Sequence, residues 1–211
     1  MSNDSRLEVV PHAFSIDEPW RVPPGARGVP LLNSSNGNPP RLETTLHTFH
    51  DGERVYFIFD GDDDHVVATH LERDAPLWEQ DVVELFLSPS HPSRYFEIEA
   101  SPRGTWFDAA IHSPDGKRKT MEVDRDWNCN DLFVAVRHLR DIQGAGRFTT
   151  VVALPFACMG VPAPQPGDSW RANFFRIDRH PEGDEFTAWR PTWKSPPDFH
   201  LPDAFGEMIF R

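Results

Sequence analysis

A succession of short strand-like segments, with almost no helical periodicity between them, constrains the fold of this chain more than any other feature. Turn signals such as SPS, PRG and SPDG separate these segments, as they separate the strands of all-β proteins. The 21 prolines keep any helix short, because proline lacks a backbone N–H and disrupts a helix interior. Strands are expected at residues 42–49, 55–59, 82–87, 95–100, 105–111, 132–139, 148–154, 170–177 and 208–210, with one helical turn at 155–159. We therefore predict an all-β fold, an antiparallel, jelly-roll-like β-sandwich of about nine to eleven strands with short helical turns.

The length of 211 residues is typical of one large domain, and no internal repeat or low-complexity tract divides the chain. Residues 1–40 differ from the rest because they carry two Pro-Pro pairs and the polar run NSSNGNP. Apolar residues that could anchor this segment are Phe14, Ile16, Trp20, Val29, Leu31 and Leu32. We predict a single domain over residues 1–211, with residues 1–40 as an extended arm packed on it.

The net charge argues against two classes of partner. The chain carries 33 Asp and Glu against 21 Lys and Arg, a formal net charge of −12. Surfaces that bind nucleic acids or anionic membranes are basic, so neither partner is expected. No stretch reaches the roughly 18 consecutive apolar residues that a membrane helix needs.

The N-terminus and the cysteines bear on the cellular compartment. The first residues lack a basic stretch followed by an apolar one, so the sequence shows no signal peptide and by itself indicates the cytoplasm. Cys129 and Cys158 show no metal-ligand spacing. We expect two separate buried or half-buried thiols, because a disulfide would require an oxidising compartment.

Strand parity places carboxylates on one face of neighbouring strands. In residues 82–87, Glu84 lies opposite an apolar face, and in residues 95–100, Glu97 and Glu99 share one face. This face is either the solvated outside of a sandwich or a polar concave surface with aromatic plates. Sugars bind to surfaces of the second kind, because carboxylates accept hydrogen bonds from hydroxyls and aromatic rings stack on the C–H side of the sugar.

Three tryptophans stand out among the seven in the chain. Most should be buried, because tryptophan is large and apolar. Trp78, however, lies in a polar loop that enters a strand, and Trp189 and Trp193 lie in a segment interrupted by proline. Tryptophans in loops near strand ends are candidate ligand contacts.

The run WEQDVVELFL at residues 78–87 resembles the signature of carbohydrate-binding module family 9, in which W-E-x-D-x-V-E-x-F leads from a loop into a central strand. Further landmarks occur in the same order: DEPW at 17–20, ALPF at 153–156, GDSWRANF at 167–174 and PDAFGEM at 202–208. The resemblance spans almost the whole chain. It implies a standalone β-sandwich that binds a mono- or oligosaccharide or the end of a polysaccharide without catalysis. It also suggests a secreted or periplasmic protein, so the compartment stays open.

The resemblance also implies site residues. Family members hold the sugar ring between two aromatic side chains, and Trp78 matches the first while the second falls on Phe199, where the family has tryptophan. Glu84 matches a carboxylate that binds sugar hydroxyls. Some members place a basic residue on the next strand, where this chain has Glu97 or Glu99. The predicted carbohydrate site therefore contains Trp78, Glu84, Glu97, Trp189 and Phe199.

Family members also hold structural calcium, and the run DGDDD at residues 60–64 is the candidate here. Its alternating carboxylates, Asp60, Asp62 and Asp64, match the first ligands of an EF-hand loop. The glycine and glutamate that such a loop requires are missing. The run therefore predicts either a Ca²⁺ site of another kind or a solvated acidic turn, and no organic cofactor is expected.

Two alternatives to a binding module remain open. A glycoside hydrolase could draw its acid and nucleophile from Asp81, Glu84, Glu97, Glu99 and Asp108, although no spacing selects a pair. No nucleophile elbow and no His-Glu-x-x-His motif supports another hydrolase. Related sandwich domains bind haem through a methionine and a histidine, and the candidate methionines are Met121, Met159 and Met208. A Soret band in the purified protein would support this alternative.

Overall fold

The computed structural model describes residues 5–140 and 146–211. Residues 1–4 lie outside the described part, and they belong to the N-terminal stretch in which the sequence shows no signal peptide. The described chain forms 14 strands and four short 3-10 turns, which confirms the predicted all-β sandwich. In these ranges no helix is long and apolar enough to cross a membrane.

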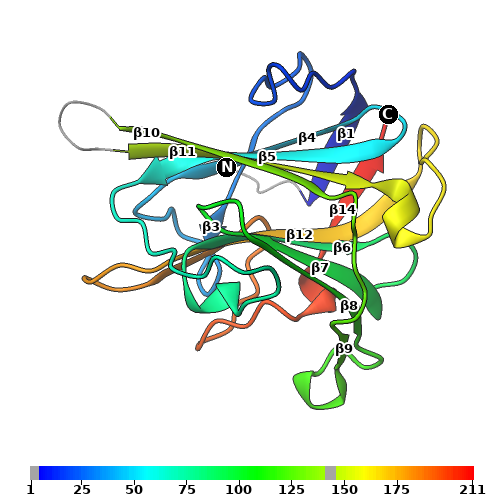
Figure 1. The fold of residues 1–211 in the computed structure, drawn as a ribbon. Coiled ribbons are helices and arrows are strands. Elements are labelled where there is room, and N and C mark those ends of the chain that lie inside the picture. The colour runs from blue at the N-terminus through cyan, green and yellow to red at the C-terminus, as the bar shows by residue number, and fades with distance from the viewer. Residues whose placement is uncertain (1–4, 141–145) are drawn as a thin grey trace.

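The strands form two layers that face each other (Figure 1). The first layer contains, in order, β10 (Phe133–Arg140), β11 (Gly146–Pro155), β5 (Arg54–Asp63), β4 (Thr44–His50) and the short β2 (Val29–Pro30). The second contains β14 (Gly206–Phe210), β12 (Ser169–Asp178), β6 (Val82–Ser88), β7 (Arg94–Ala100), β8 (Trp106–His112) and β9 (Glu122–Asp124). In addition, β13 (Glu185–Ala188) pairs with β12, and β3 (Leu32–Asn33) pairs with β13. The 3-10 turns are η1 (Leu77–Glu79), η2 (Arg118–Thr120), η3 (Phe156–Met159) and η4 (Pro202–Ala204).

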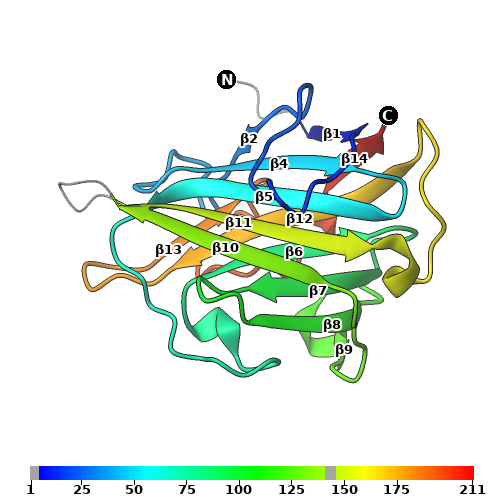
Figure 2. The ribbon, with the colours of Figure 1, turned by 45° about the horizontal axis from the view of Figure 1, so that its top comes forward.

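The strand β1 (Arg6–Pro11) connects the two layers. Its first residues pair in parallel with β14, and its last two pair in parallel with β4, so that β1 and β14 lie side by side in both views (Figures 1 and 2). This strand was not predicted, because it lies in the segment expected to be an irregular arm. The rest of that segment does pack on the domain: Phe14 stacks on Tyr56 of β5, with ring centroids 4.5 Å apart.

The main hydrophobic core lies between the layers. Alternate residues of each strand point into it, as the two-residue period of a strand requires. Fully buried members include Phe57 and Phe59 from the first layer and Leu85, Ile98 and Phe174 from the second. These contacts fix the positions of β6, β7 and β12.

A second hydrophobic cluster covers the outer face of β6, β7 and β12. Residues of these strands that point away from the main core, such as Val82, Phe86 and Phe175, are buried by the loop residues Leu77 and Phe205. Burial on both faces explains why VVELFL is apolar at successive positions. The outer face of this layer is therefore not a solvated surface.

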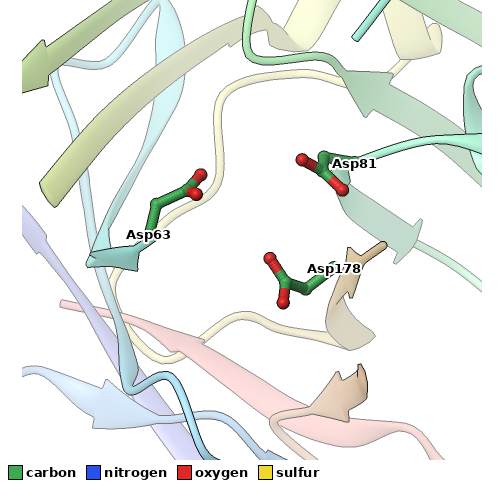
Figure 3. Close-up of side chains that lie close together, drawn as sticks. All are labelled: Asp63, Asp81 and Asp178. Atoms are coloured by element: carbon green, nitrogen blue, oxygen red, sulfur yellow. The ribbon is translucent and has the colours of Figure 1, made fainter. Parts of the chain in front are cut away.

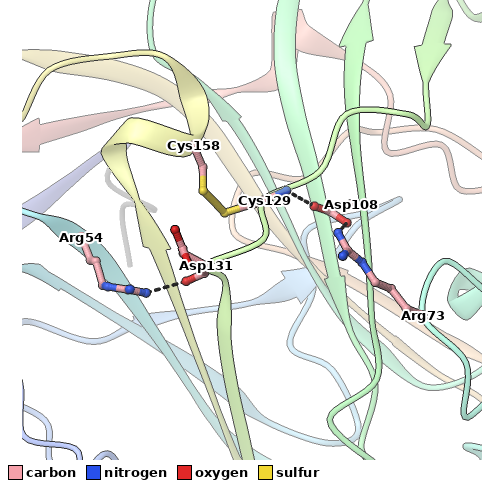
Figure 4. Close-up of a disulfide and its surroundings, with 6 residues drawn as sticks. All are labelled: Arg54, Arg73, Asp108, Cys129, Asp131 and Cys158. Atoms are coloured by element: carbon pink, nitrogen blue, oxygen red, sulfur yellow. Dashed lines mark hydrogen bonds and ion pairs between the residues drawn. A yellow bond between two sulfur atoms is a disulfide. The ribbon is translucent and has the colours of Figure 1, made fainter.

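The expectation of two separate thiols is wrong, because Cys129 and Cys158 form a disulfide with a Cα–Cα distance of 5.3 Å. The antiparallel pairing of β10 with β11 brings the loop before β10 next to η3, which follows β11. Sequence spacing does not reveal this proximity. The backbone N–H of Cys129 also donates to Asp108, whose other oxygen accepts from Arg73 (2.6 and 2.7 Å; Figure 4).

Removing the disulfide should destabilise the fold. The two cysteines are 29 residues apart, and a loop of this size constrains the unfolded chain enough to contribute about 3–4 kcal/mol. The double variant Cys129→Ser/Cys158→Ser should lose about this much free energy of unfolding in urea denaturation. As a control, a reductant should destabilise the wild type to a similar extent and leave the variant unchanged. Equal stability of the two oxidised proteins would contradict the prediction.

Candidate functional site

A pocket of about 360 Å³ lies on the outer face of β6, β7 and β12. Its lining combines three carboxylates, four aromatic rings and three guanidiniums: Glu84, Glu97, Glu99, Trp78, Phe107, Phe186, Phe199, Arg118, Arg125 and Arg179. This combination of side chains makes the pocket the candidate functional site of the described chain.

The three glutamates form the floor of the pocket. Glu84 on β6 and Glu99 on β7 are direct cross-strand partners, and Glu97 lies two residues before Glu99 on the same face, as strand parity predicts. One oxygen of each carboxylate lies within 4.8 Å of the others. The residues are 2%, 6% and 0% exposed for Glu84, Glu97 and Glu99. We call these three residues the glutamate floor.

Burial and mutual repulsion favour the protonated form of the glutamate floor. Burial raises the pKa of Glu84 and of Glu99 well above its ordinary value, and repulsion from the neighbouring carboxylates raises each further. Burial likewise raises the pKa of Glu97 to about 7, although the guanidinium of Arg118 opposes this shift. At neutral pH the floor therefore carries protons, so that its carboxyl groups can donate hydrogen bonds as well as accept them.

A buried histidine at the pocket does not compensate the glutamate floor. His200 lies 2.8 Å from the Tyr95 hydroxyl through Nδ1 and 3.6 Å from Glu97 through Nε2. Burial and the charge of Arg118 lower the pKa of His200 to about 3, so the imidazole is neutral at physiological pH. The sequence contained no signal for His200, because it lies in a loop far along the chain from β7.

Both predicted clamp aromatics line the pocket, but they differ in exposure. Trp78 is half-buried, with its ring 5.5 Å from Phe107 in an edge-on contact and the Arg125 guanidinium 5.5 Å above it. Phe199 is only 6% exposed and stacks on Phe175, with ring centroids 4.1 Å apart. Trp78 is therefore the more accessible plate.

Trp189 lies in a different place from the one predicted. It is 0% exposed and belongs to the core between the layers, with its ring 5.6 Å from that of Phe174. The cause is β13, whose pairing with β12 continues in a hydrogen bond from the Trp189 N–H to the Phe174 carbonyl oxygen (2.8 Å). This pairing places Trp189 in the core, so it is a structural residue and no part of the pocket lining.

Each of the predicted calcium ligands contacts an arginine. Asp60 and Asp62 both pair with Arg147 (3.0 Å each), and Asp64 pairs with Arg41 (2.5 Å). Two of the three carboxylates thus share one guanidinium. Calcium binding by this chain stays a prediction.

Asp63, which lies between the predicted ligands, instead points toward Asp81 and Asp178 (Figure 3), within 4.8 Å of them. This aspartate cluster has its own positive partners, since Arg176 contacts Asp178 and Asp63 (2.8 and 3.8 Å). Asp81 accepts hydrogen bonds from the backbone N–H groups of Val67 and Arg179. The cluster therefore has cationic and backbone partners within the chain, although burial still raises the pKa of Asp81 to about 6 and that of Asp178 above its ordinary value.

The residues considered for a glycoside hydrolase or for haem binding lie in different parts of the structure. Asp81 belongs to the aspartate cluster, and Asp108 holds Arg73 and the Cys129 backbone, so neither reaches the pocket. Met159 and Met208 belong to the main core. Of the candidate residues for these two functions, only the glutamate floor and Met121 line the pocket.

The pH dependence of stability should reflect the glutamate floor. The pKa of Glu97 is about 7 in the folded protein against an ordinary 4.5, so the folded state binds more protons across this window. The free energy of unfolding should therefore fall as pH rises from 4.5 to above 7. In urea denaturation at several pH values, Glu97→Gln should flatten this fall, whereas the exposed Glu122→Gln should keep it. A Glu97→Gln profile that overlays the wild type would refute this assignment.

The fold resembles that of solved carbohydrate-binding proteins. A candidate carbohydrate-binding protein from Bacteroides uniformis is 19% identical, with a TM-score of 0.76, and the match covers 98% of this chain and 99% of that one. A family 9 module from Caldicellulosiruptor kristjanssonii in complex with cellotriose is 14% identical, with a TM-score of 0.62 and coverage of 98% and 93%. A family 9 module from the same organism in complex with glucose is 14% identical, with a TM-score of 0.63, and the match covers 98% of this chain and 95% of that one. These likenesses show a shared fold.

The sequence itself also matches a family model. Curated protein sequences gave no match. The model of carbohydrate-binding family 9, in contrast, matches residues 40–210, which include every residue of the pocket lining and the strands of both layers except the short β2 and β3. The chain therefore belongs to carbohydrate-binding family 9.

Proposed function

We propose that this protein binds carbohydrate without catalysis, and that the sugar occupies the pocket above the glutamate floor. The observation that carries the proposal is the meeting of carboxyl groups with accessible aromatic rings in one ligand-sized pocket of a family 9 chain. Carboxyl groups exchange hydrogen bonds with sugar hydroxyls, and aromatic rings pack against the apolar face of the sugar. The pocket thus offers partners both for the hydroxyl groups and for the apolar face of a sugar.

In this arrangement Trp78 stacks on the sugar ring, and Phe199 packs from the opposite wall. Glu84 and Glu97 accept hydrogen bonds from hydroxyl groups at the base. Arg118 and Arg125 line the same pocket and can donate to ring or hydroxyl oxygens. A neutral sugar therefore meets both donors and acceptors.

The placement of the carboxylates favours binding over hydrolysis. A glycosidase needs two carboxyl groups on either side of the scissile bond, one of them free to act as base or nucleophile. Here the three carboxyl groups share one floor, and all are almost fully buried. The ligands of the Caldicellulosiruptor modules, glucose and cellotriose, further support a mono- or oligosaccharide as partner.

Loss of the Trp78 ring should weaken sugar binding. Trp78→Ala should reduce the affinity for glucose and cello-oligosaccharides about tenfold or more, because packing of a sugar on an aromatic ring contributes on the order of 1–2 kcal/mol. Calorimetric titration and a glycan array would measure this, and urea denaturation would verify the fold.

The matched control is Trp193→Ala, which removes a tryptophan that is 67% exposed and lines another depression. It should bind sugars as the wild type does. Unchanged affinity of Trp78→Ala for every sugar that the wild type binds would refute the site, and hydrolysis products on the array would favour an enzyme.

A further inference from the structure

The glutamate floor lacks the positive partners that the aspartate cluster has. In the aspartate cluster, Arg176 and Arg41 contact Asp178 at 2.8 and 3.0 Å. In the described residues, the only basic group within 4.0 Å of a floor carboxylate is the neutral His200, 3.6 Å from Glu97. Buried carboxylates are normally paired with cations. When its carboxyl groups ionise, the floor therefore becomes a negative site whose counter-charge the described residues do not fully supply.

Glu99 is the most deeply buried member of the floor. It is 0% exposed, and neither of its carboxylate oxygens has a hydrogen-bond partner of good geometry, although the Trp78 backbone and the Glu97 carboxyl lie close enough to influence its pKa. Glu99 belongs to the lining of the pocket, so a ligand on the floor would lie beside this carboxyl group. Buried acceptors without a donor are costly in a folded protein, and a donor group on the ligand would remove that cost.

The arginines at the pocket offset the floor only in part, since Arg118 and Arg179 lower the pKa of Glu84 against the larger effect of burial. Arg118 pairs with Asp198 (2.9 Å), and Arg179 pairs with Asp184 (2.6 Å). Arg125 lies over the Trp78 and Phe107 rings. The titratable and charged groups around the floor are these three arginines, His200 and Tyr95. The three carboxyl groups of the floor therefore outnumber the guanidiniums that have no other partner.

The number and placement of the carboxyl groups match a primary ammonium group. An ammonium carries three N–H donors, and the floor offers three carboxyl groups, each with an oxygen within 4.8 Å of the others. Calcium would need six to eight oxygens from ligands that adapt in position. The floor offers three side chains on two paired strands, which hold their positions rigidly.

We propose that the pocket selects sugars that carry a free primary amine, with the ammonium group of a 2-amino-2-deoxy sugar seated on Glu84, Glu97 and Glu99. This inference rests on the proposed carbohydrate binding and names the class of sugar. An N-acetylated sugar lacks the positive charge and two of the N–H donors, and a neutral hexose offers one hydroxyl in their place. Both should therefore bind more weakly.

Calorimetric titration at neutral pH with glucosamine, glucose and N-acetylglucosamine tests the inference. Glucosamine should bind about tenfold more tightly than the other two, since a charge-assisted hydrogen bond exceeds a neutral one by about this factor. A chelator should leave the titration unchanged. Binding should also release protons, because the ammonium favours the ionised floor, and the measured heat should change with the ionisation enthalpy of the buffer.

A matched pair of variants assigns the preference to the floor. Glu99→Gln keeps the shape of the side chain and removes one charge, and it should bring the affinity for glucosamine close to that for glucose. Glu79→Gln removes an exposed carboxylate next to Trp78 and should keep the preference. Urea denaturation should find Glu99→Gln at least as stable as the wild type, because the substitution relieves repulsion among buried carboxylates.

The outcomes separate this inference from the proposed function. Equal binding of glucosamine and glucose would overturn the inference and leave carbohydrate binding intact. Glucosamine binding that a chelator abolishes would overturn it in favour of a metal ion on the floor. If no sugar binds, both the inference and the proposed function fail.

Discussion

The packing of the two sheets against each other allows this protein to hold three carboxyl groups together in a pocket. Core residues such as Leu85, Ile98 and Phe174 fix β6, β7 and β12 from one side. The strand residues that alternate with these core residues must then point to the outer face of the layer. This alternation brings Glu84 and Glu99 together as cross-strand partners. Like charges in this position repel. The apolar contacts on both faces of the layer outweigh that repulsion, so the fold keeps a locally unfavourable arrangement at the place where a ligand would relieve it.

The two acidic clusters show how similar residues can have different roles. The aspartate cluster lies where β5 and β12 end and β6 begins, and Arg176, Arg41 and backbone N–H groups contact it. This cluster ties the layers together. The glutamate floor has no comparable partners among the described residues. Burial raises the pKa of carboxyl groups in both clusters, so the two clusters differ in their partners within the chain and not in the direction of these shifts.

The family scaffold and the choice of side chains contribute separately to function. Solved structures with only 14–19% identity share this sandwich, so the scaffold does not depend on most individual residues. The pocket, in contrast, depends on a few. Phe199 stands where the family resemblance implies tryptophan, and stacking on Phe175 keeps it largely buried. Glu97 or Glu99 stands where a basic residue is implied. Both differences alter the lining of the pocket and leave the fold unchanged.

The sequence by itself determined most of the long strands, their inward and outward faces and the family, because two-residue periodicity, turn residues and a collinear motif are local properties. It also located Trp78 and Glu84, which lie within the motif. Only the tertiary structure decided which distant residues meet. It placed Trp189 in the core, paired Asp60 and Asp62 with Arg147, joined Cys129 to Cys158, made β1 a strand and brought His200 to the pocket. These contacts join segments that lie far apart in the sequence and share no local pattern. The order in which the strands pair brings these segments together, and it thereby sets which residues meet, which are buried and which charges are paired.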